Sequence, residues 1–411
     1  MANPKLRFKA DDGTDFPEWR QYKLGNLGSF KKGKGLSKDQ LSEEGNPCIL
    51  YGQLYTNYNE VIKSVVSKTN ASLDNAVLSE GNEVLFPNSD VTPDGIACAS
   101  YLPFANVILG GDISVFKCNE GIRGDVLSYI INSPNGKQQI YRIAQGTTVI
   151  HTSASSLSKI LVNYPSSQEE QRKIADFLST FDDKVEAKEQ QLEALQETKK
   201  GLLQQIFSQQ LRFKADDGTE FPDWRKTSIA KIAKVIGGGT PSTKNPEYWD
   251  GDVLWFTPSE INSKYLSTSQ KCITDLGVKK SSAKVLPKNT LLLTTRASLG
   301  LCSINNLDQL VSTNQGFQSL VCNECVNHEF LYYCISTKSF QNEMLRLSSG
   351  STFKEISSTA LKSINVCVPC FEEQRKIAEF LGAFDEKIEA VKRQLEALRE
   401  IKKGLLQQMF V

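Results

Sequence analysis

A long internal repeat constrains what this chain can fold into more than any other feature of its sequence. Residues 6–20 (LRFKADDGTDFPEWR) return at 211–225 with only Asp/Glu exchanges, and residues 169–207 return at 372–410. The longer pair is identical at 28 of its 39 aligned positions. Self-similarity on this scale indicates one structural unit used twice, so we expect the two halves of the chain to share a fold.

The stretches between the repeated blocks, residues 21–168 and 226–371, resemble each other only faintly. Their matches still fall in one order: VLSEGNEVLF against VLPKNTLLLT, VFKCNE against LVCNE, VLSYIINS against FLYYCIST, and GTTVIHTSASSL against GSTFKEISSTAL. Short β-type runs predict strands at CILYG, EVLF, NVIL and ISVFK in the first stretch and at VLWF, LLLTT and GFQSLVC in the second. Residues 126–143 and 329–347 are the best helix candidates. We therefore expect a mixed α/β domain, with a core of its own, in each stretch.

The long repeated blocks carry a heptad pattern typical of a coiled-coil seam. If Lys188 and Lys199 fill the gaps, the first seam contains Ile174, Leu178, Phe181, Val185, Leu192, Leu195, Leu202 and Ile206. The second contains Ile377, Leu381, Phe384, Ile388, Val391, Leu395, Leu398, Lys402, Leu405 and Met409. Each block predicts one helix of about 58 Å, at ~1.5 Å per residue. The alternative is two unrelated surface helices, each on its own domain, but the seam is longer than one domain normally covers.

Two local features of these helices carry predictions of their own. Ser166 and Glu169 have the spacing of a capping box for the first helix. Gly201 and Gly404 lie inside the heptad pattern, where glycine costs about 1 kcal/mol relative to alanine. The helices are therefore expected either to fray at these glycines or to pack unusually closely there.

Connectivity predicts how the two helices pair. The first helix carries the chain from one variable domain to the other, so the second should run back antiparallel and bring the C-terminus near the N-terminus. The predicted fold class is α+β: two similar mixed α/β domains joined by a long antiparallel two-helix coiled coil, with a circular, pseudo-twofold repeat. The predicted segments are 1–20, 21–168, 169–210, 211–225, 226–371 and 372–411, which alternate short repeat, variable domain and helix.

Net charge excludes a strongly basic polymer. The chain has 48 Lys and Arg against 47 Asp and Glu, which gives +1. Residues 226–369 hold 15 basic and 10 acidic residues, a net +5, whereas residues 21–168 hold 12 of each. A nucleic-acid role must therefore depend on local charge. The N-terminus lacks the apolar core of a secretion signal, and the chain lacks a run of 18 apolar residues, so a cytoplasmic protein is expected.

The sequence offers little material for catalysis. Residues 28–35 (GSFKKGKG) nearly form a phosphate-binding loop, but Gly35 stands where a Ser or Thr hydroxyl is needed. The methyltransferase motif Asn/Asp-Pro-Pro-aromatic is absent, and two His residues poorly support a Ser-His-Asp triad. Cys322/Cys325 and Cys367/Cys370 could form a four-thiolate zinc site. Only the second copy has these pairs, so we expect reduced thiols, with no metal and no catalytic residue.

The layout of two variable domains, each followed by an EEQRKIA…LEAL helix, resembles the specificity subunit of type I restriction-modification systems. Residues 237–261 and 49–62 are similar to segments of target-recognition domains in that family. The resemblance covers essentially the whole chain. It implies that each variable domain reads one half of a split, asymmetric DNA site and that the paired helices set the spacer. It also implies docking of two methyltransferase subunits, with restriction subunits in the full complex. Those partners would bring S-adenosylmethionine, ATP and Mg, none of which this chain is expected to bind.

Residue chemistry suggests which side chains meet DNA, because Arg pairs with guanine and Asn or Gln with adenine through two hydrogen bonds. The DNA-contacting candidates are Lys31, Lys32, Lys34, Gln53, Asn57 and Tyr58 in the first domain and Thr240, Ser242, Thr243, Lys244, Arg296, Asn314 and Gln315 in the second. The lysines are equally compatible with a solvated basic turn. Tyr51, Tyr55 and Trp255 are expected in the core.

Two other functions compete with DNA recognition. A self-sufficient restriction or methyltransferase enzyme would transfer methyl groups from S-adenosylmethionine without partners. A coiled-coil scaffold without a DNA role would show no sequence-specific DNA binding in its complex.

Overall fold

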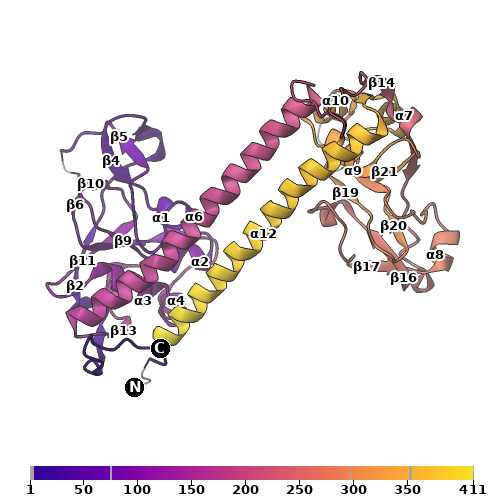
Figure 1. Cartoon of the computed structure of the whole chain (residues 1–411). Helices are drawn as coiled ribbons and strands as arrows, with labels where there is room; N and C mark the ends of the chain where they lie inside the picture. The colour runs from indigo at the N-terminus through magenta and orange to yellow at the C-terminus, as the bar shows by residue number, and fades with distance from the viewer. Residues whose placement is uncertain (1–3, 75, 297, 351–353, 411) are drawn as a thin grey trace. The chain divides into compact units, whose positions relative to one another are not determined.

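The structure is a computed structural model that describes residues 4–74, 76–296, 298–350 and 354–410. The chain divides into two compact units: residues 1–190 with 393–411 form unit 1, and residues 191–392 form unit 2. Each unit combines a short repeated segment, a variable stretch and portions of both long helices (Figure 1). This organisation confirms the predicted fold class.

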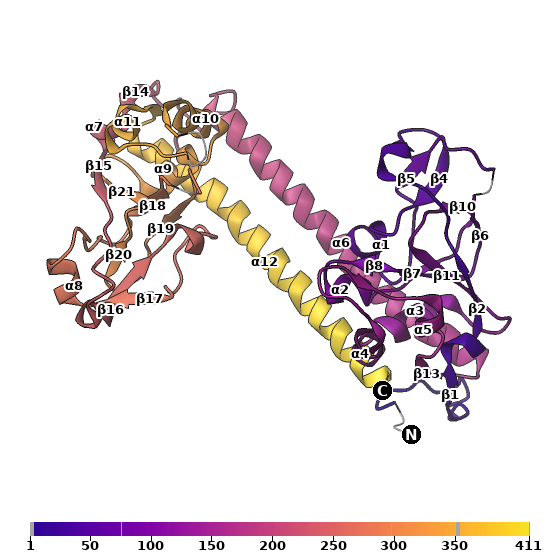
Figure 2. The same ribbon diagram turned by 180° about the vertical axis from the view of Figure 1, so that it is seen from behind.

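Two long helices, α6 (Gln168–Phe207) and α12 (Phe371–Met409), are continuous throughout. In unit 1, Glu189 of α6 pairs with Arg399 of α12, and Asp182 pairs with Lys402. In unit 2, Lys199 pairs with Asp385. In these pairs, the residue number increases along α6 as it decreases along α12, so the helices run antiparallel. Both views show the two helices side by side (Figure 2). The predicted antiparallel pairing is confirmed within each unit.

The globular part of unit 1 is built on two main sheets. One has the strand order β2–β11–β7–β9, formed by Gly28–Lys32, Ile113–Cys118, Glu83–Pro87 and Ser100–Leu102. The other has the order β3–β5–β4–β10–β6, formed by Leu41–Ser42, Ser67–Thr69, Asn46–Ile49, Ala105–Leu109 and Leu78–Glu80. Two small ladders pair β1 (Arg20–Lys23) with β13 (Leu161–Tyr164) and β8 (Ser89–Asp90) with β12 (Ile150–His151). Short helices are α1 (Gln53–Thr56), α2 (Pro93–Ile96) and α5 (Ala154–Leu157).

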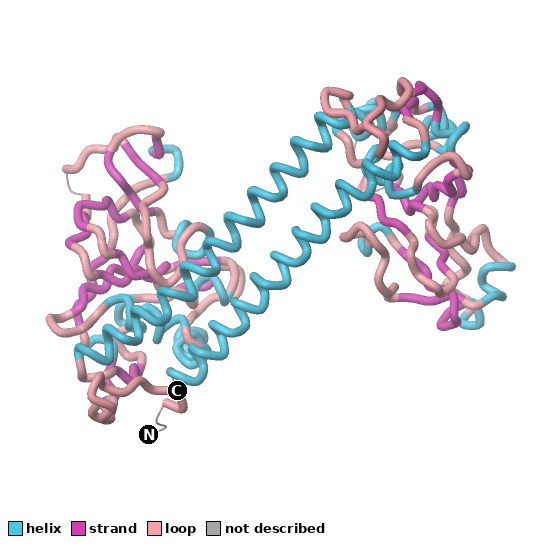
Figure 3. The backbone as a smooth tube through the Cα atoms, in the orientation of Figure 1, coloured by secondary structure: helices cyan, strands magenta, loops and turns pink. Residues whose placement is uncertain are grey.

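Unit 2 repeats this plan with fewer strands. One sheet has the order β15–β21–β18–β19, formed by Ala233–Gly237, Phe317–Cys322, Leu291–Thr294 and Cys302–Ile304. The other has the order β17–β16–β20, formed by Lys271–Ile273, Trp249–Phe256 and Val311–Thr313. β14 (Arg225–Ser228) pairs with β22 (Asn365–Val368). Short helices are α7 (Ile229–Ile232), α8 (Asp275–Lys279) and α11 (Ser358–Ser363). In Figure 3 the strands of each unit lie within its globular part.

Each predicted helix of the variable stretches is two helices in the structure. Residues 126–143 fall in α3 (Gly124–Asn132) and α4 (Pro134–Ile143), and residues 329–347 fall in α9 (His328–Ile335) and α10 (Lys338–Leu347). The Ser133 and Thr337 side chains accept backbone N–H bonds at the start of α4 and α10. These caps begin a new helix, and Pro134 cannot continue the old one.

The ends of the long helices belong to the domain cores. Ile174 and Leu178 of α6 are buried in the main core of unit 1, together with Leu406 and Met409 of α12. The corresponding cluster in unit 2 contains Ile206, Ile377 and Leu381. Between these ends, Ile388, Val391 and Leu395 are buried, whereas Val185, Leu192, Leu195, Leu202 and Leu398 are half-buried; Leu405 packs against the core of unit 1. The heptad pattern thus serves two kinds of packing, with the domain at the ends and with the other helix between them.

The short repeated segment is attached to the start of each long helix by the same contacts. Arg7 binds the buried carboxylate of Glu170 through two hydrogen bonds of 3.0 and 2.9 Å. Arg212 binds Glu373 in the same way, at 3.2 and 2.9 Å. Phe181 and Phe384 also lie beside this junction: they stack on Phe177 and Phe380, which in turn contact Phe8 and Phe213. Two-bond Arg–carboxylate pairs explain why these residues are retained in both copies.

The circular character of the repeat is visible in the backbone. The Leu6 amide donates to the Gln408 carbonyl at 3.2 Å, and the Leu211 amide donates to Gln205, the matching residue of the first helix, at 3.1 Å. The short repeated segment is therefore bonded to the end of a long helix in both units. In unit 1 this helix is α12, from the other end of the sequence, and in unit 2 it is α6, which residues 208–210 connect directly to the segment. The two terminal residues themselves lie outside the described residues.

Two predictions about the long helices are wrong. The Ser167 hydroxyl, not Ser166, accepts a helix-start bond, from the Glu170 amide at 3.3 Å, because α6 begins at Gln168 and Ser167 is the residue before it. The helices neither fray nor pack closely at their glycines. A side chain at Gly201 or Gly404 would have no atom within 4 Å.

Candidate nucleic-acid interface

In unit 2, three neighbouring strands, β15, β21 and β18, begin or end at the same end of their sheet, which we call the sheet edge. Antiparallel pairing sets Gly237 at the end of β15 opposite Gln318, and Thr294 at the end of β18 opposite Phe317 at the start of β21. The residues just beyond these strand ends must therefore meet. They are the loop after β15, the turn before β21 and the segment after β18.

The predicted residues Thr240, Asn314, Gln315 and Arg296 come together at this edge. The Gly239 amide donates to the Thr313 carbonyl at 2.8 Å, and the Thr240 hydroxyl donates to the Gln315 side chain. The Thr295 amide donates to the Gly316 carbonyl at 2.8 Å, which places its neighbour Arg296 beside the same turn. Ser242, Thr243 and Lys244 are exposed further along the loop.

Glycine is required where this loop crosses the turn. A Cβ on Gly238 would lie 1.9 Å from the Asn314 carbonyl oxygen, a distance that no side chain tolerates. The backbones of the two segments can approach this closely only without a side chain at that position. The glycine run is therefore what brings the polar loop to Asn314 and Gln315.

Arg296 is held by an acidic partner rather than free in solvent. Its Nη2 donates to Glu355 Oε1 at 2.6 Å, and this hydrogen bond raises the pKa of Arg296. The two side chains remain 47% and 44% exposed. Glu355 thus orients a guanidinium that still faces solvent.

Unit 1 has the same edge with different side chains. Lys32 at the end of β2 pairs with Ser114, and Pro87 at the end of β7 pairs with Ile113 at the start of β11. The Gly33 amide bonds to Ile113 at 2.9 Å, as Gly238 bonds to Phe317. Strand register therefore aligns four positions across the units: Lys32 with Gly237, Gly111 with Gln315, Ser89 with Arg296, and His151 with Glu355.

An open groove of about 610 Å³ lies at this edge of unit 1 and contains two of the predicted lysines. It is lined by Lys32, Lys34, Ser37, Gln40, Tyr51 and Asp112, with the glycines between them. The Lys32 side chain is 71% exposed and 4.0 Å from Asp112. Tyr51 is exposed here, so its predicted place in the core is wrong, whereas Trp255 is buried as predicted.

The other candidates of unit 1 serve local structure. Lys31 lies 3.1 Å from Glu80 and 3.2 Å from the buried Glu83, so its charge is neutralised internally. The Gln53 side chain accepts from the Leu50 amide and donates to the Ser67 hydroxyl.

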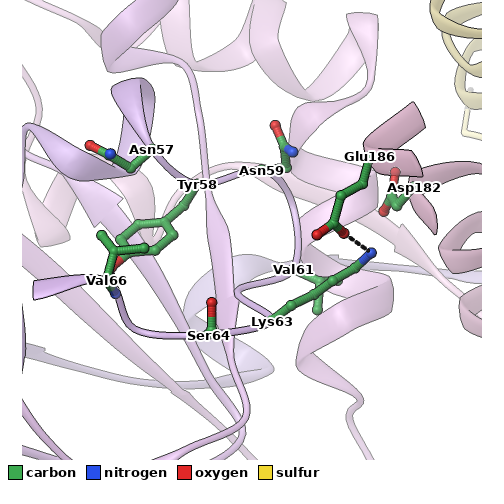
Figure 4. A pocket seen from close by; sticks show the side chains of 9 residues that line it. All are labelled: Asn57, Tyr58, Asn59, Val61, Lys63, Ser64, Val66, Asp182 and Glu186. Carbon is green, nitrogen blue, oxygen red and sulfur yellow. Dashed lines mark hydrogen bonds and ion pairs between the residues drawn. The ribbon is translucent and has the colours of Figure 1, made fainter. Parts of the chain in front are cut away.

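Asn57 and Tyr58 line a separate pocket of about 120 Å³ against α6, where the Tyr58 hydroxyl accepts from the Val66 amide at 3.1 Å (Figure 4). Burial raises the pKa of Tyr58. Lys63 in this pocket binds Asp183 and Glu186 of α6. This pocket lies between the domain and α6, and its lining residues differ from those of the open groove.

Sequence reasoning missed Ser89 and His151, which pair at the edge of unit 1. The signal was present, because the match of GTTVIHTSASSL with GSTFKEISSTAL already aligns His151 with Glu355. What could not be seen was that Glu355 contacts Arg296, since that pairing joins residues 59 positions apart.

Among the described residues, no three His, Cys, Asp or Glu side chains are placed to hold a metal ion. The cysteines in that part of the chain are free thiols. Within the same residues, no helix is long and apolar enough to cross a membrane.

Comparison with known proteins identifies the family to which both halves of the chain are similar. The family described as "Type I restriction modification DNA specificity domain" matches residues 17–197 and 222–400. The chain is 39% identical over 209 residues to the type I restriction enzyme MjaIX specificity subunit of Methanocaldococcus jannaschii, covering 50% of this chain and 48% of that one. It is 23% identical over 418 residues to the MjaVIII specificity subunit of the same organism, covering 97% and 94%.

A solved structure shows the same fold. The S subunit of a type I restriction-modification system from M. genitalium aligns with a TM-score of 0.59 at 18% identity, over 100% of this chain and 99% of that one. The family matches account for both halves of the chain, and the predicted resemblance is confirmed. The chain belongs to the type I restriction-modification DNA specificity family.

Proposed function

We propose that the two globular domains read different halves of one bipartite, asymmetric DNA site. The observation that carries this proposal is that each unit has its own copy of the sheet edge. Matched positions in the two copies hold different side chains. Lys32, Ser89 and His151 in unit 1 stand where unit 2 has Gly237, Arg296 and Glu355. One scaffold with two sets of contacting groups is suited to two unlike half-sites.

The chemistry of each edge indicates what it contacts. Arg296 can donate two hydrogen bonds to guanine, and the Asn314 and Gln315 amides match adenine. Lys32 and Lys34 suit phosphate oxygens, which position a protein on DNA without reading sequence. The net charge of +5 in residues 226–369 adds attraction to the phosphate backbone.

The repeated helices support docking of two identical partners. Packing explains why buried residues are the same in both copies, but it does not explain why exposed ones are. Exposed and identical positions include Arg172 and Arg375, Lys184 and Lys387, Glu193 and Glu396, and Lys200 and Lys403. Two equal surfaces fit two methyltransferase subunits, with restriction subunits joining the full complex. These partners supply S-adenosylmethionine, ATP and Mg, and the complex acts on DNA in the cytoplasm.

Methylation mapping tests the reading of half-sites. The chain is co-expressed with its methyltransferase subunit, and modified adenines are mapped across a genome. A motif of two defined parts separated by an unread spacer is expected. Replacing residues 226–371 by the matching domain of a relative should change one part only. A contiguous motif, or a change in both parts, would contradict the proposal.

Stoichiometry tests the duplicated docking surface. Arg172→Glu or Arg375→Glu alone should reduce the complex from two methyltransferase subunits to one, and the double variant should bind none, as measured by native mass spectrometry. Lys159→Glu, an exposed change in a variable domain, is the matched control and should keep both partners. Unchanged stoichiometry in the double variant would reject this surface.

A further inference from the structure

Each unit contains a cluster of charged side chains where the globular domain meets both long helices. In unit 1, Lys402 of α12 lies 2.5 Å from Asp182 of α6 and 2.6 Å from Glu60 of the domain. The Tyr129 hydroxyl donates to the second Asp182 oxygen at 2.5 Å. The ammonium also lies 5.5 Å from the centre of the Tyr129 ring. We call these four residues cluster 1.

Unit 2 contains the counterpart, cluster 2. Lys199 of α6 donates to Asp385 of α12, and Tyr333 donates to the same carboxylate. Asp385 and Lys199 match Asp182 and Lys402 in the repeat, so the roles of the two helices are exchanged. The domain adds Lys264, which lies 3.1 Å from Glu329, donates to the Tyr333 hydroxyl at 2.9 Å and lies 3.8 Å from Asp385.

Burial separates cluster 1 from ordinary surface ion pairs, and cluster 2 is intermediate, with Lys199 and Asp385 each 23% exposed. In cluster 1, Lys402 is 14% exposed, Glu60 16% and Asp182 9%. A second interhelical pair of unit 1, Glu189 with Arg399, is 41% and 58% exposed. A buried charge that loses its partner is costly, whereas an exposed pair contributes little. An alignment of the helices that separated Lys402 from Asp182 would therefore be strongly disfavoured.

An apolar heptad seam cannot impose such a preference alone. Sliding one helix by a heptad, roughly 10 Å, again places apolar residues opposite apolar residues. A polar residue within the seam specifies one register, at a cost in stability. Lys199 and Lys402 interrupt the two seams in this way, and in the observed register each meets an Asp of the other helix.

We propose that clusters 1 and 2 fix the register between α6 and α12, attach each domain to the helix pair, and so determine the spacer length accepted between the half-sites. This inference rests on the proposed function, because a spacer is defined only if the domains read two half-sites. Lys199, Lys402 and their partners are thus positioning residues, distinct from the groups at the sheet edges.

The two clusters are not equivalent, so we expect substitutions in them to differ in the size of their effect on spacer selectivity. In cluster 1 a single lysine faces both Asp182 and Glu60, so Lys402→Met leaves two buried carboxylates without a cation. In cluster 2, Lys264 remains beside Asp385 after Lys199→Met. The Lys402 variant should therefore have the larger effect.

The test measures spacer selectivity in the complex with methyltransferase subunits. Duplexes carry the mapped half-sites with the native spacer or one base pair more or less, and the methylation rates are compared. For Lys402→Met we expect the preference for the native spacer to fall about tenfold, and for Lys199→Met about threefold, with half-site preference unchanged. Lys402→Arg keeps the charge and should retain the preference, as should the exposed control Glu189→Gln.

The outcomes separate this inference from the proposed function. If the wild-type complex shows no bipartite site, the proposed function fails. If that site exists but both lysine variants keep full spacer selectivity, the clusters do not set the register. A merely structural role would lower methylation equally at all spacers, which also overturns the proposal. If Lys402→Met does not fold, Lys199→Met, which retains Lys264, decides between these outcomes.

Discussion

Gly201 and Gly404 occupy helix interiors where an added side chain would meet no atom within 4 Å. Glycine loses more backbone entropy than alanine when it enters a helix. Each Gly→Ala change is therefore expected to raise the free energy of unfolding by about 0.5–1 kcal/mol. Denaturant titration followed by circular dichroism measures this. Gly238→Ala is the matched control and should destabilise, because its Cβ would lie 1.9 Å from the Asn314 carbonyl. Stabilisation by Gly238→Ala would contradict the packing described.

Lys32 and Lys34 are expected to bind phosphate, unlike their neighbour Lys31. Removing either as Ala should weaken DNA binding by the complex similarly for all sequences and reduce the slope of log affinity against log salt by about 1. Lys31→Met should leave that slope unchanged, because Glu80 and Glu83 already neutralise Lys31. If all three variants have the same slope of log affinity against log salt, Lys32 and Lys34 do not contact phosphate.

Arg296 should act on sequence rather than on general affinity. Arg296→Ala is expected to lower discrimination at one base pair of one half-site by about 1–3 kcal/mol, and to leave the other half-site unchanged. Competition binding with single-base variants of the site measures this. A uniform loss of affinity over all sequences would instead identify Arg296 as a phosphate contact.

At the scale of elements, the buried tyrosines between domain and helices make stability sensitive to alkali. Burial, and then Asp182, raise the pKa of Tyr129. Burial lowers the pKa of Lys402, but Glu60 and Asp182 more than offset this and raise it overall. The folded state thus holds these protons more tightly than the unfolded state. This stabilisation is complete below the ordinary pKa values of 10.0 and 10.5 and is lost as the pH rises past them.

Melting temperatures between pH 8 and pH 11 test this, and a fall is expected above about pH 10. Tyr129→Phe should melt lower at neutral pH, because it loses the bond to Asp182, but should show a shallower alkaline decline. Burial also raises the pKa of Asp182. A steeper decline in Tyr129→Phe would refute the assignment.

At the scale of the whole molecule, helix length should translate into spacer length. One heptad added to both α6 and α12 between the two clusters lengthens each helix by about 10 Å, equivalent to roughly 3 base pairs of DNA. Methylation mapping should show unchanged half-sites with the longer spacer. A heptad added to one helix alone should abolish modification, because the charged pairs no longer meet. An unchanged spacer with both insertions would reject the proposal that helix length sets spacer length.

The circular repeat makes a separate prediction. Joining Val411 to Met1 and opening the chain between Gln209 and Gln210 should give a folded, specific subunit, because Leu6 and Leu211 already make matching joints. Gel filtration and methylation mapping measure this. Opening the chain at Gly238 instead, within the interface, is the control and should abolish recognition. Loss of folding in the first permutant would show that the two joints are not equivalent.

The sequence predicted local and repeated features well and long-range contacts poorly. Strands such as residues 83–87 and 113–118 were predicted because their apolar runs are local signals. The break before Pro134 was missed, although Ser133 caps the next helix. Among the candidate contacts, Thr240 and Gln315 meet, whereas Lys31 is neutralised by acids about 50 residues away. Such partners depend on sheet register, which a single sequence does not display.

By itself, the sequence determined that one fold occurs twice, that two long helices accompany it, and that the domains differ in charge. These conclusions follow from self-similarity, periodicity and counting, which need no tertiary contacts. Only the tertiary structure decided which side chains lie together at the sheet edge, and that Lys199 and Lys402 are seam residues paired with carboxylates that are 23% and 9% exposed. The physical reason is that the free energy of a charge depends on its partner and burial, and both are set by residues far away along the chain.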